Sequence, residues 1–294
     1  MTKKKSISYS QFSQWDKCPY MWKLNYVDKL GSFTDNIYTL FGTSMHEVLQ
    51  EYLRVMYSDS IKAADELYLE EQLEDRLKKN FLEIMKKNGG EEFCTKNDMV
   101  EFYEDGVRIL DYFKKKRNQY FSKRGYELIG IETALGYELP KNIRFRGYID
   151  LIIKDTVRNK IKIIDIKTST MGWNKYQKAD KHKTDQLLLY KQFYSKQHDI
   201  PMDRIEVEYF IVKRKLYENM DFPQKRIQTF IPANGTPSIN KVNRRLELFM
   251  DDCFTDDGEY RDDHIYNKLP SKKNCRWCDF RDKPELCDKK GVKV

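Results

Sequence analysis

Apolar residues recur every three to four positions through most of the first 124 residues, which predicts a helical N-terminal part. Capping and breaking residues divide this part: a proline interrupts the first helix, Thr43 or Ser44 is placed to cap the second, and the Asn88-Gly89-Gly90 triplet ends the third. The predicted helices are Ser8–Val27 (broken near Pro19), Ser44–Tyr57, Ile61–Lys87 and Asp98–Phe121.

From Gly125 onward the pattern changes to alternation and to runs rich in β-branched and aromatic residues, which predicts strands. One predicted helix lies between the third and fourth strands, and another follows the last strand. The second and third strands are predicted to form a hairpin. The predicted elements are strands Tyr126–Glu138, Arg144–Lys154 and Lys160–Thr168, helix Thr184–Gln197, strands Arg204–Lys213 and Arg226–Ile231, and helix Ser238–Asp252. The core order of helix, three strands, helix and strand predicts an α/β fold with a mixed sheet flanked by helices.

Composition narrows the class of protein. The 294 residues are 40% hydrophobic, which is enough to bury a full core. Lys and Arg outnumber Asp and Glu by 54 to 46, and this net charge of +8 suits a polyanionic partner without requiring one. No run approaches the roughly 20 apolar residues of a membrane span. Because the basic start Met1–Lys5 lacks the apolar run of a secretory signal, we expect a cytoplasmic protein with no membrane partner.

Carboxylates and a lysine are concentrated on the predicted hairpin. Asp150 ends the run Gly147-Tyr148-Ile149-Asp150 in one strand, and Asp165-Ile166-Lys167 lies in the next. Residues two apart on a strand share a face, so Asp165 and Lys167 project together. Two carboxylates from neighbouring strands can hold Mg²⁺ or Mn²⁺, and the lysine can orient a water or stabilise charge on a phosphate. The short Asp-x-Lys signal alone also fits an ordinary salt bridge.

Four motifs in order give the sequence a resemblance to the PD-(D/E)xK nuclease superfamily, particularly to RecB- and AddB-like exonucleases and their CRISPR-associated members. The motifs are Gly42-Thr43-Ser44-Met45-His46, Gly147-Tyr148-Ile149-Asp150, Asp165-Ile166-Lys167 and Gln186-Leu187-Leu188-Leu189-Tyr190. The resemblance implies a restriction-endonuclease-like core with N-terminal helical additions and a C-terminal Cys-rich tail. We therefore expect one nuclease domain over residues 1–294, with a mainly helical part at 1–124, a catalytic core at 125–235, and a C-terminal helix and cysteine tail at 236–294 that packs with Cys18.

The same resemblance implies roles for individual residues. His46, Asp150, Asp165 and the Ile166 carbonyl are the implied metal ligands, and Lys167 is the implied catalytic lysine. Gln186 and Tyr190 would support the site, and their spacing agrees because positions four apart on a helix share a face. Glu132 resembles an acidic position that precedes the Gly-x-x-Asp motif. Since an exposed strand carboxylate explains it equally well, we leave Glu132 out of the predicted catalytic set.

Four of the six cysteines form a pattern. Cys275, Cys278 and Cys287 lie in the short tail, and Cys18 lies near the opposite end of the chain. The resemblance implies that these four thiolates hold a 4Fe-4S cluster. A structural Zn²⁺ on the same thiolates stays open, because spacing does not distinguish the two. Cys94 and Cys253 have no partner pattern and are interpreted as ordinary thiols.

Basic and aromatic residues interleave just before the Gln186 helix and are predicted DNA contacts. They are Trp173, Lys175, Tyr176, Lys178, Lys181 and Lys183, with Trp173 or Tyr176 as stacking residues. The sequence thus predicts a metal-dependent DNA nuclease, and the resemblance implies an exonuclease of recombination, repair or phage DNA processing in a bacterial or phage-infected cell. Its expected partners are DNA ends or single strands and a helicase, recombination or CRISPR-adaptation protein. An endonuclease and a non-catalytic DNA-binding scaffold subunit of a recombination complex remain as alternatives.

Overall fold

A mixed β-sheet of six strands runs through the computed structural model, which describes residues 4–31 and 35–288. The strands are β1 (Ser6–Ile7), β2 (Tyr126–Leu139), β3 (Ile143–Asp155), β4 (Lys160–Ser169), β5 (Ile205–Lys213) and β6 (Ile227–Phe230). Their order is β1-β3-β4-β5-β6, and β2 pairs with β3. β1 runs parallel to β3 and β4 parallel to β5, whereas the other pairs are antiparallel. The predicted mixed sheet and the predicted β3–β4 hairpin are confirmed.

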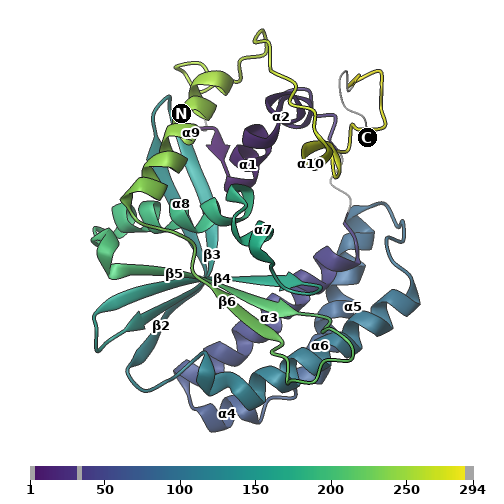
Figure 1. The fold of residues 1–294 in the computed structure, drawn as a ribbon, viewed down its shortest axis with the longest axis vertical. Helices are drawn as coiled ribbons and strands as arrows, with labels where there is room; N and C mark the ends of the chain where they lie inside the picture. Colours follow the sequence, from purple (N-terminus) through teal and green to yellow (C-terminus); the bar gives the residue numbers. More distant parts are fainter. Residues whose placement is uncertain (1–3, 32–34, 289–294) are drawn as a thin grey trace.

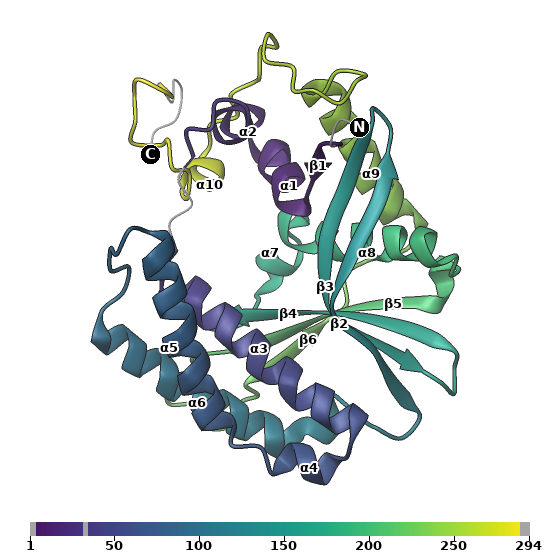
Figure 2. The ribbon, with the colours of Figure 1, turned by 180° about the vertical axis from the view of Figure 1, so that it is seen from behind.

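Helices cover both faces of this sheet (Figures 1 and 2). They are α1 (Tyr9–Lys17), α2 (Pro19–Tyr26), α3 (Ile37–Ser58), α4 (Ile61–Asp65), α5 (Leu69–Lys87), α6 (Lys96–Lys116), α7 (Lys175–Lys178), α8 (Lys181–His198), α9 (Thr236–Cys253) and α10 (Lys272–Cys275), with short 3₁₀ turns at Arg117–Gln119 and Met202–Arg204. One core packs α3, α5 and α6 on the sheet, and a second packs α1, α8 and α9 on its other face. The fold is therefore the predicted α/β class, with a mixed sheet flanked by helices.

Two predicted helices differ from the observed ones. α3 begins at Ile37 rather than at Ser44, because the Asn36 side chain accepts the N–H groups of Tyr38 and Thr39 in a capping box. Gly42 thus lies inside the helix, where a Cβ would approach Thr168 Oγ1 to 3.3 Å. Thr43 and Ser44 therefore do not cap this helix.

The predicted helix Ile61–Lys87 is divided into α4 and α5. At the break, Lys114 Nζ donates to the Asp65 carbonyl at 2.6 Å and to the Leu67 carbonyl at 3.4 Å. The Asp65 side chain also accepts from Arg117 Nη1 at 2.7 Å. These side-chain donors satisfy groups that a continuous helix would have to satisfy itself, so tertiary contacts stabilise the break.

β3 shares one of its edges between two partners, and this creates a fork in the sheet. β4 pairs with β3 only over Leu151–Asp155, and β1 pairs with Arg144 and Phe145 farther along. Past the Leu151–Ile164 pair, β4 stays with β5 as far as Ser169 and leaves β3. Asp150 and Asp165 are the first residues beyond that last pair on each strand, so the divergence places both carboxylates at the fork.

Helices α1 and α2 lie beside α10 and the cysteine tail (Figures 1 and 2). Tyr20 N–H donates to the Asn267 carbonyl at 3.1 Å, and its hydroxyl donates to the Leu286 carbonyl at 3.0 Å. Asn274 Nδ2 donates to the Lys17 carbonyl at 2.8 Å. These bonds seat the cysteine tail on α1 and α2, while the proposed division of the chain into one domain with three parts stays a prediction. Among residues 4–31 and 35–288, no helix is both long and apolar enough to cross a membrane.

Candidate functional site

The strand fork brings the predicted carboxylates and lysine together. Asp150 Oδ2 accepts the Ile166 N–H at 2.8 Å, which replaces the ladder bond that β3 and β4 no longer make. Asp165 and Lys167 share a face as alternation predicts, and Lys167 Nζ lies 2.7 Å from Asp165 Oδ2. The Asp165 side chain is only 3% exposed. The fork therefore holds a buried carboxylate pair with one ammonium group beside it.

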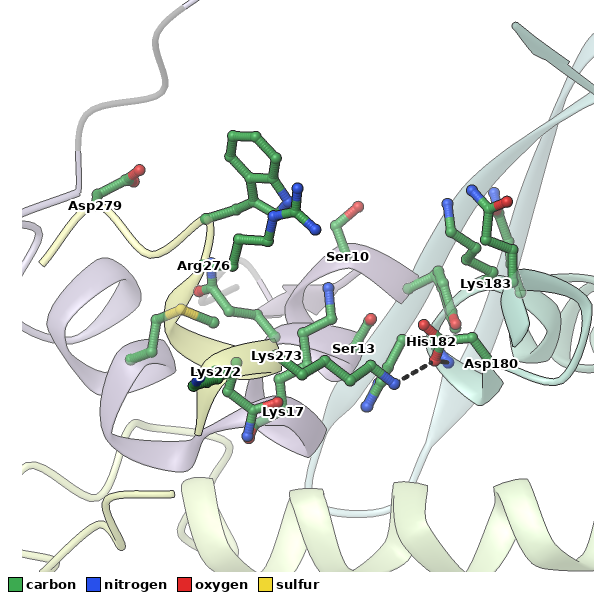
Figure 3. Close-up of a pocket in the computed structure, with 17 residues that line it drawn as sticks. Ser10, Ser13, Lys17, Asp180, His182, Lys183, Lys272, Lys273, Arg276 and Asp279 are labelled. Atoms are coloured by element: carbon green, nitrogen blue, oxygen red, sulfur yellow. Dashed lines mark hydrogen bonds and ion pairs between the residues drawn. The ribbon is translucent and has the colours of Figure 1, made fainter. Parts of the chain in front are cut away.

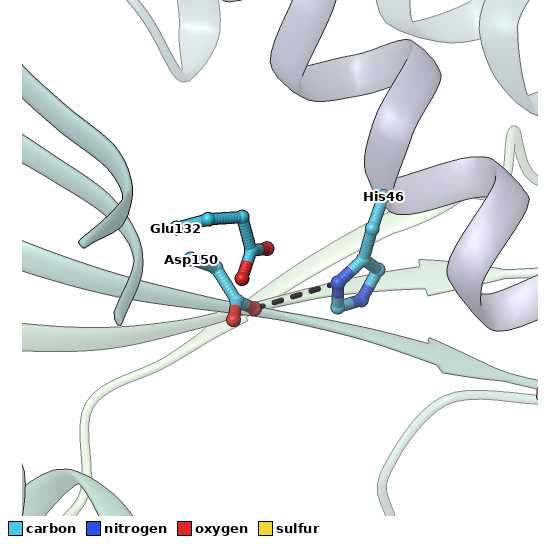
Figure 4. Close-up of side chains that lie close together, drawn as sticks. All are labelled: His46, Glu132 and Asp150. Carbon is cyan, nitrogen blue, oxygen red and sulfur yellow. Dashed lines mark ion pairs between the residues drawn. The ribbon is translucent and has the colours of Figure 1, made fainter. Parts of the chain in front are cut away.

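His46 and Glu132 join Asp150 from two other elements (Figure 4). One ligand atom from each of these three residues lies within 4.8 Å of the others. His46 comes from α3, with Nδ1 3.6 Å from Asp150 Oδ2. Glu132 comes from β2, where its backbone has a left-handed φ of 47°. Strain of this kind at a non-glycine residue is characteristic of functional sites.

Glu132 is the residue that our sequence prediction left out. The register of β2 and β3 pairs Ile131 with Leu151 and Thr133 with Ile149, so Glu132 stands opposite Asp150. The predicted strand ends, Glu138 and Arg144, are themselves partners in this register. If the two predicted strands are paired from Glu138 and Arg144 inward, Glu132 falls opposite Asp150. The sequence therefore contains the information that places these two carboxylates together.

Gln50 is a further residue that the sequence did not reveal. It lies one helical turn after His46 on α3, is 4% exposed, and donates through Nε2 to Glu132 Oε1 at 2.6 Å and to the Asp150 carbonyl at 3.2 Å. A buried amide that bridges two strands at this point fixes the Glu132 carboxylate. Its only sequence signal is its i+4 spacing from His46.

Gln186 and Tyr190 extend the site from α8. Gln186 Oε1 accepts from Lys167 Nζ at 3.2 Å, and Gln186 Nε2 donates to the Tyr190 hydroxyl at 3.1 Å. Gly147 makes room for this contact, because a Cβ there would lie 2.8 Å from the Tyr190 hydroxyl oxygen. The chain of contacts from Asp165 through Lys167 and Gln186 to Tyr190 holds the lysine in one position.

Burial sets the protonation of these groups. Burial raises the pKa of Asp150 to about 6 and that of Asp165 to about 6, although the charge of Lys167 opposes both shifts. Burial lowers the pKa of Lys167, but the two carboxylates outweigh it and leave the pKa raised. Burial and then the charge of Lys167 lower the pKa of His46. Near neutral pH the site thus combines ionised carboxylates, a neutral imidazole and an ammonium group.

This donor set fits a hard divalent cation. Carboxylate oxygens and a neutral imidazole are ligands for Mg²⁺ or Mn²⁺, and His46, Glu132 and Asp150 already converge. The desolvated carboxylates of Asp150 and Asp165 carry an unfavourable charge that a bound cation would offset. Asp165 and the Ile166 backbone also lie near this cluster, because the charge of Asp165 and a hydrogen bond with the Ile166 backbone both act to raise the pKa of His46.

The four cysteines that are predicted to hold a cluster line one cavity. Cys18, Cys275, Cys278 and Cys287 all line a space of about 150 Å³ between α2 and the tail. Burial raises the pKa of the Cys278 thiol, and the charges of the other three thiolates act in the same direction. Cys94 and Cys253 lie elsewhere: Cys94 packs against the core that contains α5 and α6, and Cys253 is buried at the end of α9.

The predicted DNA contacts separate into different environments. Trp173 is 6% exposed and packs on Tyr209, with ring centroids 4.9 Å apart, so its prediction as a stacking residue is corrected to a core role. Tyr176 is 72% exposed on the short helix α7. The lysines differ as well: Lys181 pairs with Asp16 at 2.9 Å, Lys175 and Lys178 lie on α7, and Lys183 lines a groove beside Gln186.

Comparison with known proteins extends this picture. A family model described as the PD-(D/E)XK nuclease superfamily matches residues 6–283. A crystal structure from Eubacterium rectale, of a protein provisionally described as an exonuclease, has a TM-score of 0.44 and 12% identity and covers 84% of this chain and 79% of that chain. The structure of SSO0001 has a TM-score of 0.31 and 13% identity and covers 89% and 91%. Comparison with curated proteins gave no match. The family match includes every residue of the strand-fork site.

Proposed function

The chain belongs to the PD-(D/E)XK nuclease superfamily, and from this premise we propose that it is a metal-dependent deoxyribonuclease that digests DNA from its ends. The observation that carries the proposal is the convergence of His46, Glu132 and Asp150 at the strand fork, with Lys167 held beside them. A scaffold protein has no need of buried carboxylates whose charge is costly, or of a lysine fixed among them. The intact constellation therefore favours an enzyme over a binding subunit.

The residues of the fork divide the work of phosphodiester hydrolysis. His46, Glu132, Asp150 and Asp165 would hold a divalent cation, Mg²⁺ or Mn²⁺, whose positive charge would polarise the phosphate and lower the pKa of a water. Lys167 places its ammonium group where negative charge builds on the phosphate or where the attacking water is oriented. Gln186 accepts a hydrogen bond from Lys167, and Tyr190 accepts one from Gln186. These two bonds orient the Lys167 ammonium group, and neither partner adds a charge to the site.

The order of the motifs supports the finer assignment. It resembles that of RecB-like exonucleases, which favours digestion from ends over internal cleavage. The setting that we propose is recombination, repair or phage DNA processing in the cytoplasm of a bacterial or phage-infected cell. A helicase, a recombination protein or a CRISPR-adaptation protein would supply the DNA end.

The four cysteines are proposed to hold a 4Fe-4S cluster rather than zinc. Four thiolates on one Zn²⁺ at about 2.3 Å would lie roughly 3.8 Å apart in a tetrahedron. Cys18, Cys275, Cys278 and Cys287 line a cavity of about 150 Å³, which has room for an inorganic group larger than one Zn²⁺. The cluster would tie the tail to the α1–α2 junction, which is a structural role.

Digestion of end-labelled linear DNA and of a covalently closed circle tests the proposal. Protein purified without oxygen is incubated with Mg²⁺ or Mn²⁺, and wild type is compared with Asp165→Ala. We expect wild type to degrade the linear DNA and spare the circle, and the variant to degrade neither. Cleavage of both by wild type would replace the exonuclease with an endonuclease. Absence of metal-dependent cleavage by folded wild type would contradict the proposal.

A further inference from the structure

A groove of about 1070 Å³ leads away from the strand fork along α1 and the start of α8 to the cysteine tail. Gln186, which contacts Lys167, lines one part of it, and Arg276 and Trp277 of the tail line another. Figure 3 shows Lys183 and Asp279 toward opposite ends, with Lys17, Lys273 and Arg276 between them. The groove therefore joins the site of the proposed chemistry to the tail.

The lining of the groove is strongly basic. Its charged side chains, apart from a histidine, are the cations Lys17, Lys183, Lys272, Lys273 and Arg276 and the anions Asp180 and Asp279. Lys273 lies 3.2 Å from Asp180 and so spans the space between α10 and α8. In the part of the chain that the structure describes, the other four cations form no ion pair. Unpaired cations gathered in one cavity favour an anionic occupant with repeated charges.

Trp277 adds an aromatic surface to this basic lining. Its side chain is 83% exposed, and the Arg276 guanidinium lies 5.2 Å from the centre of its ring. It lies between Cys275 and Cys278, so any group held by these thiols fixes the backbone on both sides of it. The other tryptophans are different, because Trp22 and Trp173 are buried and Trp15 is partly buried. Trp277 is thus the tryptophan available to stack on a ligand.

We propose that this groove binds one unpaired strand of nucleic acid, with a base stacked on Trp277 and phosphates on Lys17, Lys272 and Arg276. An exposed ring can stack on the face of an unpaired base, whereas a duplex hides the faces of its bases inside the stack. Gln186 connects the groove to Lys167, so the bound strand continues into the strand fork. The inference rests on the proposed nuclease function and names the form of its substrate.

Binding of fluorescently labelled oligothymidylate in Ca²⁺, which stands in for the metal without supporting cleavage, tests the role of Trp277. We expect Trp277→Ala to bind the single strand roughly tenfold more weakly, and Trp277→Phe to recover most of the affinity. Tyr68→Ala is the matched control, because Tyr68 is 75% exposed but lies at the start of α5. Wild-type tryptophan fluorescence should be quenched on binding, and the quenching should disappear in Trp277→Phe. All variants are checked for fold and for iron content.

The cations are tested through the salt dependence of the same binding. Replacing Lys272 and Arg276 together by alanine should lower the slope of log affinity against log salt by roughly 0.7 for each phosphate that the protein no longer neutralises. Lys62→Ala with Lys78→Ala removes the same charge from α4 and α5, away from the groove, and should leave the slope almost unchanged. This pair of variants keeps the inference testable even where Trp277→Ala does not fold.

Two results would overturn the inference. One is single-strand affinity that is equal in wild type, Trp277→Ala and the Lys272 and Arg276 variant, and the other is tighter binding of a blunt duplex than of a single strand by wild type. If the wild type cleaves DNA but these variants bind normally, the groove inference fails and the nuclease proposal stands. If the groove binds strands as expected but no DNA is cleaved, the nuclease proposal fails and the groove inference stands.

Discussion

The strand fork and the cysteine site are both side-chain clusters suited to metal, but the chain builds them in opposite ways. The fork residues project from strands and from the long helices α3 and α8, and neighbouring hydrogen bonds hold them in place. The cysteines come from the α1–α2 junction and from a tail whose one described helix, α10, spans four residues. The Cys18 sulfur accepts the Leu269 N–H, at 3.4 Å.

The two sites therefore depend on a bound ligand to different degrees. At the fork, packing and hydrogen bonding already set the geometry, so a cation adds charge to an existing frame. At the tail, the proposed cluster would add to the bonds that Tyr20 and Asn274 make, and it would supply much of the stability. Substitutions at the fork should therefore reduce activity and spare the fold, whereas substitutions at the cysteines should do the reverse.

Asp150→Asn should give the largest effect and should act on activity alone. Asparagine keeps the shape of the side chain and an oxygen that can accept the Ile166 N–H, but it removes the charge that a cation requires. We expect DNA cleavage to fall roughly 10²- to 10³-fold, with little change in melting temperature. Asp203→Asn, at an exposed position on another turn, is the control. A large fall in the melting temperature of Asp150→Asn would contradict the claim that substitutions at the fork spare the fold.

Gln50→Met should have a smaller effect that tests whether Glu132 belongs to the site. Methionine fills similar space but cannot donate to Glu132 or to the Asp150 carbonyl. We expect metal affinity, measured as the Mn²⁺ concentration for half-maximal cleavage, to weaken roughly 10- to 100-fold. Rate at saturating Mn²⁺ should recover, which a folding defect would not allow. Unchanged Mn²⁺ dependence would remove both Gln50 and Glu132 from the site.

Cys287→Ala should lower stability rather than chemistry. Loss of one ligand releases the cluster and the tail, and we expect the melting temperature to fall by roughly 10 °C. The cleavage rate at saturating DNA and low temperature should stay close to that of wild type. Cys94→Ala is the matched control, because Cys94 lies outside the cluster. Normal thermal stability and iron content in Cys287→Ala would contradict the structural role.

His182 gives the smallest effect, at the α8 turn between the two regions. Burial lowers its pKa to about 4, against the charges of Asp16 and Asp180. Because the folded-state pKa lies below the ordinary value of 6.5, the neutral imidazole stabilises the fold above pH 6.5, and this contribution is lost as pH falls toward 4. His182→Gln should therefore flatten the decline in melting temperature between pH 6.5 and 4.5. An equal decline in wild type and variant would show that His182 does not titrate in this way.

The sequence predicts the parts of the fork that depend on local periodicity. Alternation put Asp165 and Lys167 on one face, and helical spacing put Gln186 and Tyr190 on one face, because each relation lies within one element. Glu132 and Gln50 depend instead on the β2–β3 register and on the placement of α3 over the sheet. Such relations between elements are set by packing, which a single-element pattern does not contain.

Tertiary packing also explains the errors at the periphery. Trp173 looked like a stacking residue because basic residues surround it, but its ring fills the core beside Tyr209. The sequence alone does not predict Trp277 as a contact, because its exposure in a groove depends on how α1 and the tail pack together. The sequence pattern starts α3 too late because Gly42 is typical of a loop, whereas close packing on Thr168 accounts for this glycine inside the helix.

The most direct test of the central claim is an anomalous difference map, recorded at the manganese edge, from crystals soaked in Mn²⁺. The account predicts a peak at the strand fork, within coordinating distance of His46, Asp150 and at least one of Glu132 and Asp165. A fork without a peak in crystals that bind Mn²⁺ elsewhere would contradict it.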